Sequence, residues 1–182
     1  MSPLDEQTPT RETLNTVSAA LPILRELEKK VLWLSTWMIH HANNVRQNRG
    51  GLGGLKVGGH QASSASVAAL MTALYFHELQ PQDRVAVKPH ASPVFHAIQY
   101  LFGNQTRRNL KNFRAFGGAQ SYPSRTKDSD DVDISTGSVG LGPAMTVFAS
   151  LAQDYLRRHT ETVQAQDPGR MIAIVGDAEM DE

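Results

Sequence analysis

Cysteine is absent from the 182-residue sequence. Disulfide bonds, thiolate metal sites and cysteine nucleophiles are therefore excluded, and the composition is compatible with a reducing compartment. The 18 basic residues equal the 18 acidic residues, so no net charge attracts nucleic acid or an anionic membrane. No apolar run approaches membrane-spanning length, and residues 1–10 lack the pattern of a signal peptide. These absences predict a soluble, cytoplasmic protein that binds neither nucleic acid nor a membrane.

An amphipathic helix is predicted in the amino-terminal part, with Pro22 near its first turn. Apolar residues then recur at alternating steps of three and four, at Leu24, Leu27, Val31, Leu34 and Met38. Trp33 and Trp37 widen this face, and we interpret it as core or subunit-interface packing. Six glycines between Gly50 and Gly59 end the helix. We therefore predict a helical extension over residues 1–50 and a second domain over residues 51–182.

The second domain alternates predicted strands and helices. Ser63 and Ser64 are candidate caps of a helix that carries Val67, Leu70, Met71 and Leu74 on one face. A strand is predicted over 84–88, a helix capped by Ser92 follows, and a short helix covers 105–113. After a long loop over 117–135, a helix is predicted with Phe148, Leu151, Ala152 and Tyr155 on one face, and then a buried strand over 171–175. This order is typical of an α/β fold, in which helices flank a parallel sheet and ligands bind beyond the carboxyl ends of the strands.

The strand over 171–175 runs directly into Gly176-Asp177-Ala178-Glu179-Met180-Asp181-Glu182. Magnesium prefers oxygen ligands and commonly takes one or two carboxylates together with phosphate oxygens. Asp177 at the strand end therefore suits a clamp for a metal and a diphosphate. An acidic helix start that complements the helix dipole explains the same residues, and the pattern alone does not separate the two interpretations.

Histidines stand at two predicted loop-to-helix junctions, His60 and His90. Free backbone amides at helix starts bind phosphate, and an imidazole can add a donor, although a lone loop histidine is more often structural. Three glycines in Ser135-Thr-Gly-Ser-Val-Gly-Leu-Gly142 likewise allow a ligand to approach the backbone. The remaining histidines, His96 among them, are expected to be surface or packing residues. The aspartates between Asp128 and Asp133 lack the spacing of a calcium loop and are expected to form a solvated turn.

Taken in order, five segments resemble the transketolase superfamily of thiamine diphosphate-dependent enzymes: Gly-Gly-His60-Gln-Ala-Ser-Ser, Lys-Pro-His90-Ala-Ser-Pro, Ser121-Tyr-Pro, the segment Ser135 to Gly142, and Gly176-Asp-Ala-Glu-Met-Asp-Glu. The resemblance covers residues 31–182 and is greatest to the homodimeric type of pyruvate dehydrogenase decarboxylase subunit. Two features favour that branch over transketolase proper. They are the Glu-Met-Asp-Glu tail and Ser121-Tyr122-Pro123, which stands where transketolases usually have Gly-His-Pro.

The resemblance implies thiamine diphosphate and Mg²⁺ as cofactors, and a 2-oxo acid or ketose phosphate as substrate. His60, His90 and Tyr122 would lie near the substrate, with both histidines also near the cofactor. The implied cofactor contacts are Gly137, Val139, Gly140, Leu141, Gly176, Asp177, Ala178 and Glu179, and Asp177 would bind the metal. In this family the cofactor supplies the chemistry and the protein positions it.

Several departures from the family pattern accompany this match. Ala178 replaces the second glycine of the usual Gly-Asp-Gly, and the family's downstream magnesium-binding asparagine, activating glutamate and pyrimidine-binding domain have no counterpart. We therefore expect the amino-terminal part of a longer enzyme, inactive alone, that forms a homodimer or pairs with a complementing carboxyl-terminal chain. An acyltransferase core is a further expected partner. The alternatives are a transketolase-type ketol transferase, a truncated non-catalytic dimerisation partner, and an unrelated phosphate-binding α/β protein.

Overall fold

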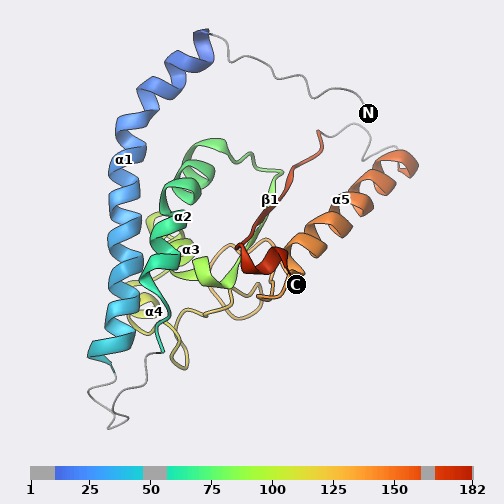
Figure 1. Ribbon diagram of the computed structural model, residues 1–182. Coiled ribbons are helices and arrows are strands. Elements are labelled where there is room, and N and C mark those ends of the chain that lie inside the picture. The colour runs from blue at the N-terminus through green and yellow to red at the C-terminus, as the bar shows by residue number, and fades with distance from the viewer. Residues whose placement is uncertain (1–10, 47–56, 161–166, 182) are drawn as a thin grey trace.

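The computed structural model describes residues 11–46, 57–160 and 167–181 (Figure 1). Its longer elements are α1 (Arg11–His40), α2 (Gln61–Ala73), β1 (Arg84–Val87), α3 (Ser92–Leu101), α4 (Arg107–Lys111), α5 (Leu141–His159) and β2 (Met171–Ile174). Short π-helical or 3-10 turns lie at His41–Val45, Leu74–Glu78, Pro89–Ala91 and Ala178–Met180. The predicted domain boundary at residues 50 and 51 lies outside the described residues.

The two strands form a small parallel sheet. β1 and β2 pair in a register that runs from Arg84 opposite Met171 to Val87 opposite Ile174. Ala86 also forms an isolated parallel bridge with Ile134, so the chain before α5 extends alongside β1. In Figure 1, α1, α2 and α3 lie on one side of the strands and α5 lies on the other. The predicted α/β class, with a parallel sheet, flanking helices and a long amino-terminal helix, is confirmed.

The main hydrophobic core joins the helices to the sheet. Its buried residues are Val31, Met71, Val85, Val87, Ala91, Val94, Phe95, Ala97, Ile98 and Val132. Each fully buried aliphatic or aromatic side chain of this kind contributes roughly 1.5–3 kcal/mol. A second cluster of Met38, Leu110, Phe113 and Ala119 joins α1 to α4 and to the turn that follows α4. That second cluster fixes the turn at residues 112–119 against the helical layer.

Helix α1 is longer than predicted. It begins at Arg11 and runs through Pro22 to His40, so the expected start near Pro22 is wrong. A proline inside a helix leaves one carbonyl without its amide donor and costs about 3 kcal/mol, which here does not end the helix. The predicted apolar face is present where α1 meets α2 and α3, with Val31 and Met38 fully buried. Trp33 instead remains 64% exposed and stacks on Trp37.

Neither of two predicted serine caps precedes its helix. α2 starts at Gln61 after His60, so Ser63 and Ser64 lie in its first turn and do not cap it. α3 starts at Ser92 itself, after a 3-10 turn that contains His90. Glycines lead into α2 and Pro89 leads into α3, and neither helix has a side-chain cap hydrogen bond. Both histidines consequently stand directly at the start of a helix.

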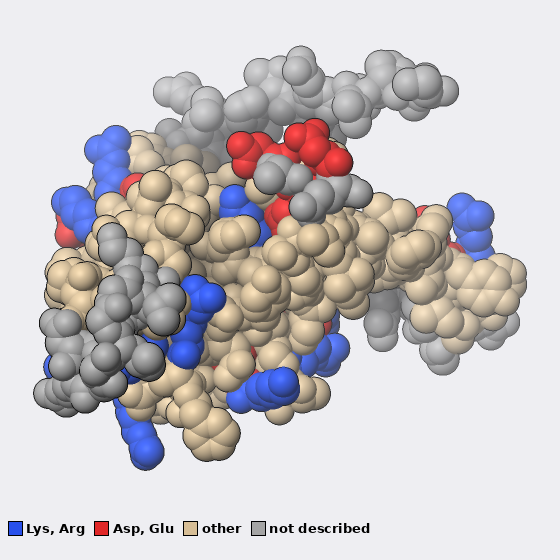
Figure 2. Space-filling view, turned by 60° about the horizontal axis from the view of Figure 1, so that its bottom comes forward, with Lys and Arg blue, Asp and Glu red and all other residues tan. Residues whose placement is uncertain are grey.

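Helix α5 has the predicted apolar face, but that face is exposed. Phe148 is 69%, Leu151 60% and Tyr155 62% exposed, while the buried residues of the helix are Gly142 and Thr146. In Figure 2 this helix projects to the right and carries few charged side chains along its length. Within the described residues, no helix combines the length and the apolar character needed to cross a bilayer.

Candidate functional site

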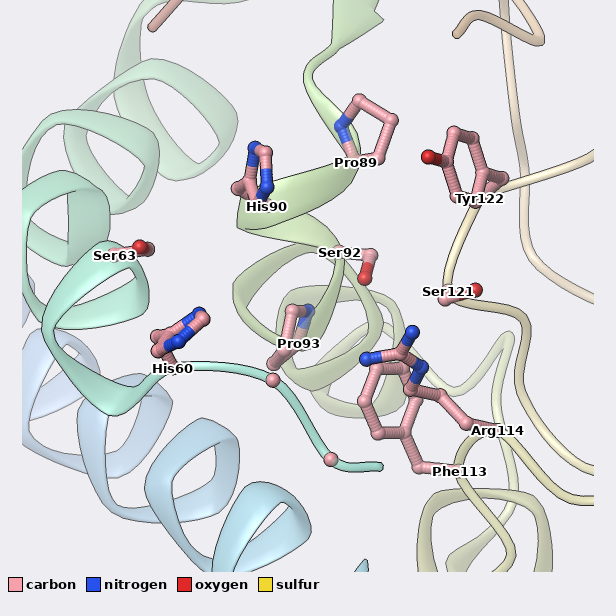
Figure 3. Close-up of a pocket in the computed structure, with 12 residues that line it drawn as sticks. His60, Ser63, Pro89, His90, Ser92, Pro93, Phe113, Arg114, Ser121 and Tyr122 are labelled. Atoms are coloured by element: carbon pink, nitrogen blue, oxygen red, sulfur yellow. The ribbon is translucent and has the colours of Figure 1, made fainter. Parts of the chain in front are cut away.

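A cavity of about 260 Å³ lies where three separate segments meet. The chain entering α2 and its first turn supply Gly58, Gly59, His60 and Ser63. The turn before α3 and the start of α3 supply Pro89, His90, Ser92 and Pro93, and the chain after α4 supplies Phe113, Arg114, Ser121 and Tyr122. Figure 3 shows the rings of His60 and His90 on one side of the cavity and Tyr122 on the other. The structure therefore brings together all three residues that the sequence predicted to be catalytic.

Close packing of the chain against α1 fixes the position of His60. A Cβ at Gly58 would lie 2.6 Å from the carbonyl oxygen of Ile39, so only glycine allows this approach. Gly59 has a φ of +86°, a conformation that favours glycine. Asn43 accepts a hydrogen bond from the Gly58 amide at 2.6 Å and donates one to the Gly59 carbonyl at 3.3 Å. The backbone just before His60 is therefore fixed by packing against Ile39 and by two hydrogen bonds to Asn43.

Tyr122 links the cavity to the glycine segment before α5. Its hydroxyl donates a hydrogen bond to Ser138 Oγ at 3.3 Å. Gly137 lies just before Ser138, half-buried and close to Leu141, while Val139 is 64% exposed and Leu141 begins α5. The cavity and this predicted cofactor segment are therefore adjacent.

The end of β2 lies next to the same segment. Gly140, with a φ of +73°, would place a Cβ 3.5 Å from the carbonyl oxygen of Glu179. The buried carboxylate of Glu179 accepts a hydrogen bond from the Gly176 amide at 2.8 Å. Asp177 begins this turn, and its backbone carbonyl accepts a hydrogen bond from the Met180 amide. Ala178 is the first residue of the 3-10 turn that follows. The predicted cofactor residues of the two segments thus meet at one edge of the sheet.

Lys88 belongs to this edge, although no role was predicted for it. Its amide donates to the carbonyl of Ile174 at 3.2 Å, which continues the strand pairing. Its Nζ lies 3.4 Å from the position that a Cβ on Gly176 would occupy. The signal was present in the sequence, because Lys88 directly follows β1 and the carboxyl ends of parallel strands lie together.

The donor groups at this edge fit a magnesium ion and a diphosphate. The carboxylate of Asp177 is exposed and makes no hydrogen bond or ion pair with any described residue, so its oxygens are free to bind a hard cation. The 19-residue α5 presents its first amides nearby, and Lys88 adds a positive charge. Glu179 is already occupied by the Gly176 amide, which leaves Asp177 as the better ligand.

His96, Asp128 and Asp130 form a second group of side chains that could bind a metal ion. Their nitrogen and oxygen atoms, however, already form hydrogen bonds within the protein. Asp128 accepts the backbone amides of Gln120 and Ser124 at 3.0 and 2.8 Å. Asp130 accepts a hydrogen bond from the side chain of Gln105 at 2.7 Å and also bonds His96 Nδ1. The expectation that His96 is a surface or packing residue is confirmed, whereas the expected solvated turn is only partly correct because Asp130 is buried.

His96 is a buried structural residue that fixes the loop carrying Tyr122. Its Nε2 donates to the Gln120 carbonyl at 2.6 Å, while Nδ1 faces the Asp130 carboxylate. Helix α3 is tied in this way to the loop two residues before Tyr122. Sequence patterns gave no sign of this long-range pair.

Comparison with known proteins gives a consistent relationship. The pyruvate dehydrogenase E1 component of Mycobacterium tuberculosis is 31% identical over 163 residues, covering 84% of this chain and 16% of that protein. The corresponding protein of Cupriavidus necator is 33% identical over 135 residues, covering 69% of this chain and 15% of that protein. The relationship to the transketolase superfamily is confirmed. A transketolase of Staphylococcus aureus is 31% identical over 67 residues, 37% of this chain and 10% of that protein.

The chain corresponds to a small part of each pyruvate dehydrogenase E1 component that it matches. No protein-family model matches the chain. The chain spans between 15% and 20% of the length of the pyruvate dehydrogenase E1 components, so their activity does not transfer to it directly. Two further pyruvate dehydrogenase E1 components, from Buchnera aphidicola and Pseudomonas aeruginosa, match 95% and 96% of this chain at 25% and 28% identity.

Proposed function

We propose that this chain is the diphosphate- and magnesium-binding part of a thiamine diphosphate-dependent enzyme of the pyruvate dehydrogenase type, which decarboxylates a 2-oxo acid oxidatively and transfers the acyl group. The convergence of the five motif segments carries this proposal. The Tyr122–Ser138 hydrogen bond joins the histidine cavity to the glycine segment, and the approach of Gly140 to Glu179 joins that segment to the end of β2.

Each part of the site has a task in this proposal. Asp177 holds Mg²⁺, while Lys88 and the first amides of α5 attract the diphosphate. The backbone around Val139 meets the aminopyrimidine ring. When bound, the cofactor supplies the carbanion-stabilising chemistry.

The cavity residues act on the substrate. His60 and His90 position the carbonyl group and hold or move a proton at its oxygen. Tyr122 lies beside the substrate, and its bond to Ser138 fixes the direction of its hydroxyl. The walls of the cavity exclude water from the reacting atoms.

The exposed apolar face of α5 is a candidate binding surface for a partner protein. Its large exposed residues include Val147, Phe148, Leu151, Tyr155 and Leu156. A contiguous apolar face of this kind typically marks a protein–protein contact. We propose that a second copy or a complementing carboxyl-terminal chain covers it in the cytoplasm, with an acyltransferase core as a further partner. A role as a non-catalytic dimerisation partner would use the same face, and a transketolase-type reaction would use the same cofactor edge.

Calorimetric titration of thiamine diphosphate and MgCl₂ tests this function. The titration is made into the chain alone and into a mixture with a chain that supplies the carboxyl-terminal part of a relative. We expect binding in the mixture and its loss in Asp177→Ala, while Asp154→Ala, an exposed carboxylate change on α5, leaves binding intact. No binding in either sample would contradict the enzyme proposal and favour the non-catalytic partner. Carbon dioxide release from pyruvate, compared with ketol transfer from a ketose phosphate, then separates the two enzyme types.

A further inference from the structure

An arginine lies in the wall of the cavity away from the two histidines. Figure 3 shows the guanidinium of Arg114 beside Ser92 and Ser121, across the cavity from His60 and His90. Among the described residues, its side chain forms no hydrogen bond and no salt bridge. The donors of this guanidinium are therefore available to a ligand in the cavity.

The backbone holds Arg114 in an uncommon conformation. Its φ is +60°, which places a residue other than glycine in the left-handed region. The Arg114 amide donates to the carbonyl of Ala119 at 2.9 Å, and the preceding Phe113 is buried in the second core cluster. Arg46 donates a further hydrogen bond to the Phe113 carbonyl at 2.5 Å. A strained residue that its surroundings fix in this way is typical of a functional position.

The positive charge at this wall is uncompensated. Burial, together with the nearby guanidinium of Arg114, lowers the pKa of Arg46. Neither arginine pairs with a carboxylate in the described part of the chain. Two adjacent cations without counter-charges favour the binding of an anion.

We propose that Arg114 forms an anion subsite that binds the carboxylate or phosphate group of the substrate, with the reacting carbonyl directed toward His60 and His90. A planar guanidinium offers paired donors that match the oxygens of either group. The hydroxyls of Ser92 and Ser121 stand beside it. This inference rests on the proposed function, and it adds the residue that selects an anionic substrate. Because the ion pair forms before any reaction, its loss weakens substrate binding.

Titration of small anions into the 182-residue chain tests this subsite. Sodium pyruvate, inorganic phosphate and pyrophosphate are added separately in low-salt buffer, and the ring proton signals of His60 and His90 are followed by NMR. Arg114→Gln removes the charge, and Arg114→Gly also removes the backbone strain, so a folding defect in one variant does not obscure the result. Arg107→Gln changes an exposed arginine on α4 and is the matched control.

We expect pyruvate or phosphate to shift the histidine signals in the unchanged protein, and both Arg114 variants to raise the dissociation constant at least about tenfold. The control should leave the constant unchanged. Equal affinity in the Arg114 variants, or no anion binding in the unchanged protein, would overturn the subsite. An effect confined to pyrophosphate would assign Arg114 to the cofactor and overturn its assignment to the substrate. Titration with magnesium and thiamine diphosphate is a separate measurement, so the cofactor proposal can fail while the anion subsite stands.

Discussion

Replacing Asp83 by asparagine tests what holds the two strands together. The carboxylate of Asp83 is buried just before β1, and Arg170 stands just before β2. Asp83 accepts the Arg170 amide at 2.7 Å and its Nε and Nη2 at 3.0 and 2.6 Å, and it accepts the Gln80 amide at 3.0 Å. These bonds between Asp83 and Arg170, called the Asp83–Arg170 clasp below, hold the two strands in the register that places Lys88 beside Gly176 at the cofactor edge.

The geometry gives the size of the effect. Asparagine can keep one acceptor oxygen for the Arg170 amide, but its NH₂ group would face the remaining donors. Hydrogen bonds to charged groups are worth about 1.5–3 kcal/mol each, and solvent screening reduces the term because Arg170 is 52% exposed. We expect Asp83→Asn to lower the free energy of unfolding by about 2–3 kcal/mol, and Tm by about 5–10 °C. Urea denaturation followed by circular dichroism measures the change, and Asp154→Asn is expected to stay within about 0.5 kcal/mol of the unchanged protein.

The same clasp predicts a dependence on pH. Hydrogen bonding to the Arg170 side chain holds the pKa of Asp83 well below its usual range. A lowered folded pKa stabilises the protein fully above the unfolded value of about 3.9, and this stabilisation is lost as the pH falls toward the folded value. The difference between the unchanged protein and Asp83→Asn should therefore be constant from about pH 5 to 8 and shrink below about pH 4. A difference under about 0.5 kcal/mol at neutral pH, or one that persists unchanged in acid, would refute the reasoning.

Three further substitutions address the loop around the cavity, each measured by urea denaturation. Gly118→Ala would place a Cβ 1.9 Å from the Asn112 carbonyl oxygen and should lower the free energy of unfolding by about 3 kcal/mol or more. The control Gly103→Ala meets open space and should lower it by about 1–2 kcal/mol, through the strain of a positive φ alone. Equal losses in the two variants would contradict the clash. Asp130→Asn replaces the buried carboxylate that bonds His96 and Gln105 by an amide and should cost about 1–3 kcal/mol, and a neutral result would show that these hydrogen bonds do not stabilise the loop. Arg114→Gly should raise the free energy of unfolding by about 1 kcal/mol because it relieves the left-handed strain, and a loss of stability would show that the side chain supports the turn.

The elements defined by local pattern were predictable from the sequence. The strand ahead of Asp177 was identified from its continuous apolar run, and the start of α5 from its glycines, because both signals are contained within a few residues. Periodicity also identified the shared face of α5, including Leu151. It could not say whether that face would be covered, since periodicity reports which residues share a side and not what lies against it.

The parts of the site that were missed depend on contacts between distant residues. His96 and Asp130 are 34 residues apart, and neither lies in a sequence motif that predicts a contact with the other. The left-handed conformation of Arg114 results from the hydrogen bond to Ala119 and from the burial of Phe113, which no local propensity encodes. Serine cap preferences likewise misplaced the start of α2 by a turn, because glycine and packing against α1 determine where that helix begins.

The pairing of β1 with β2 also has a consequence for the order of folding. Asp83 and Arg170 lie 87 residues apart, so the sheet closes only after a long loop has been brought together. The contacts of α2 with α3, by comparison, join neighbouring parts of the chain and need no such closure. Folds that depend on distant parallel pairing form slowly, because the entropy of closure is lost before the contacts compensate for it. We therefore expect the helical layer to form first, and the edge that gathers Lys88, Gly176 and Asp177 to be completed last.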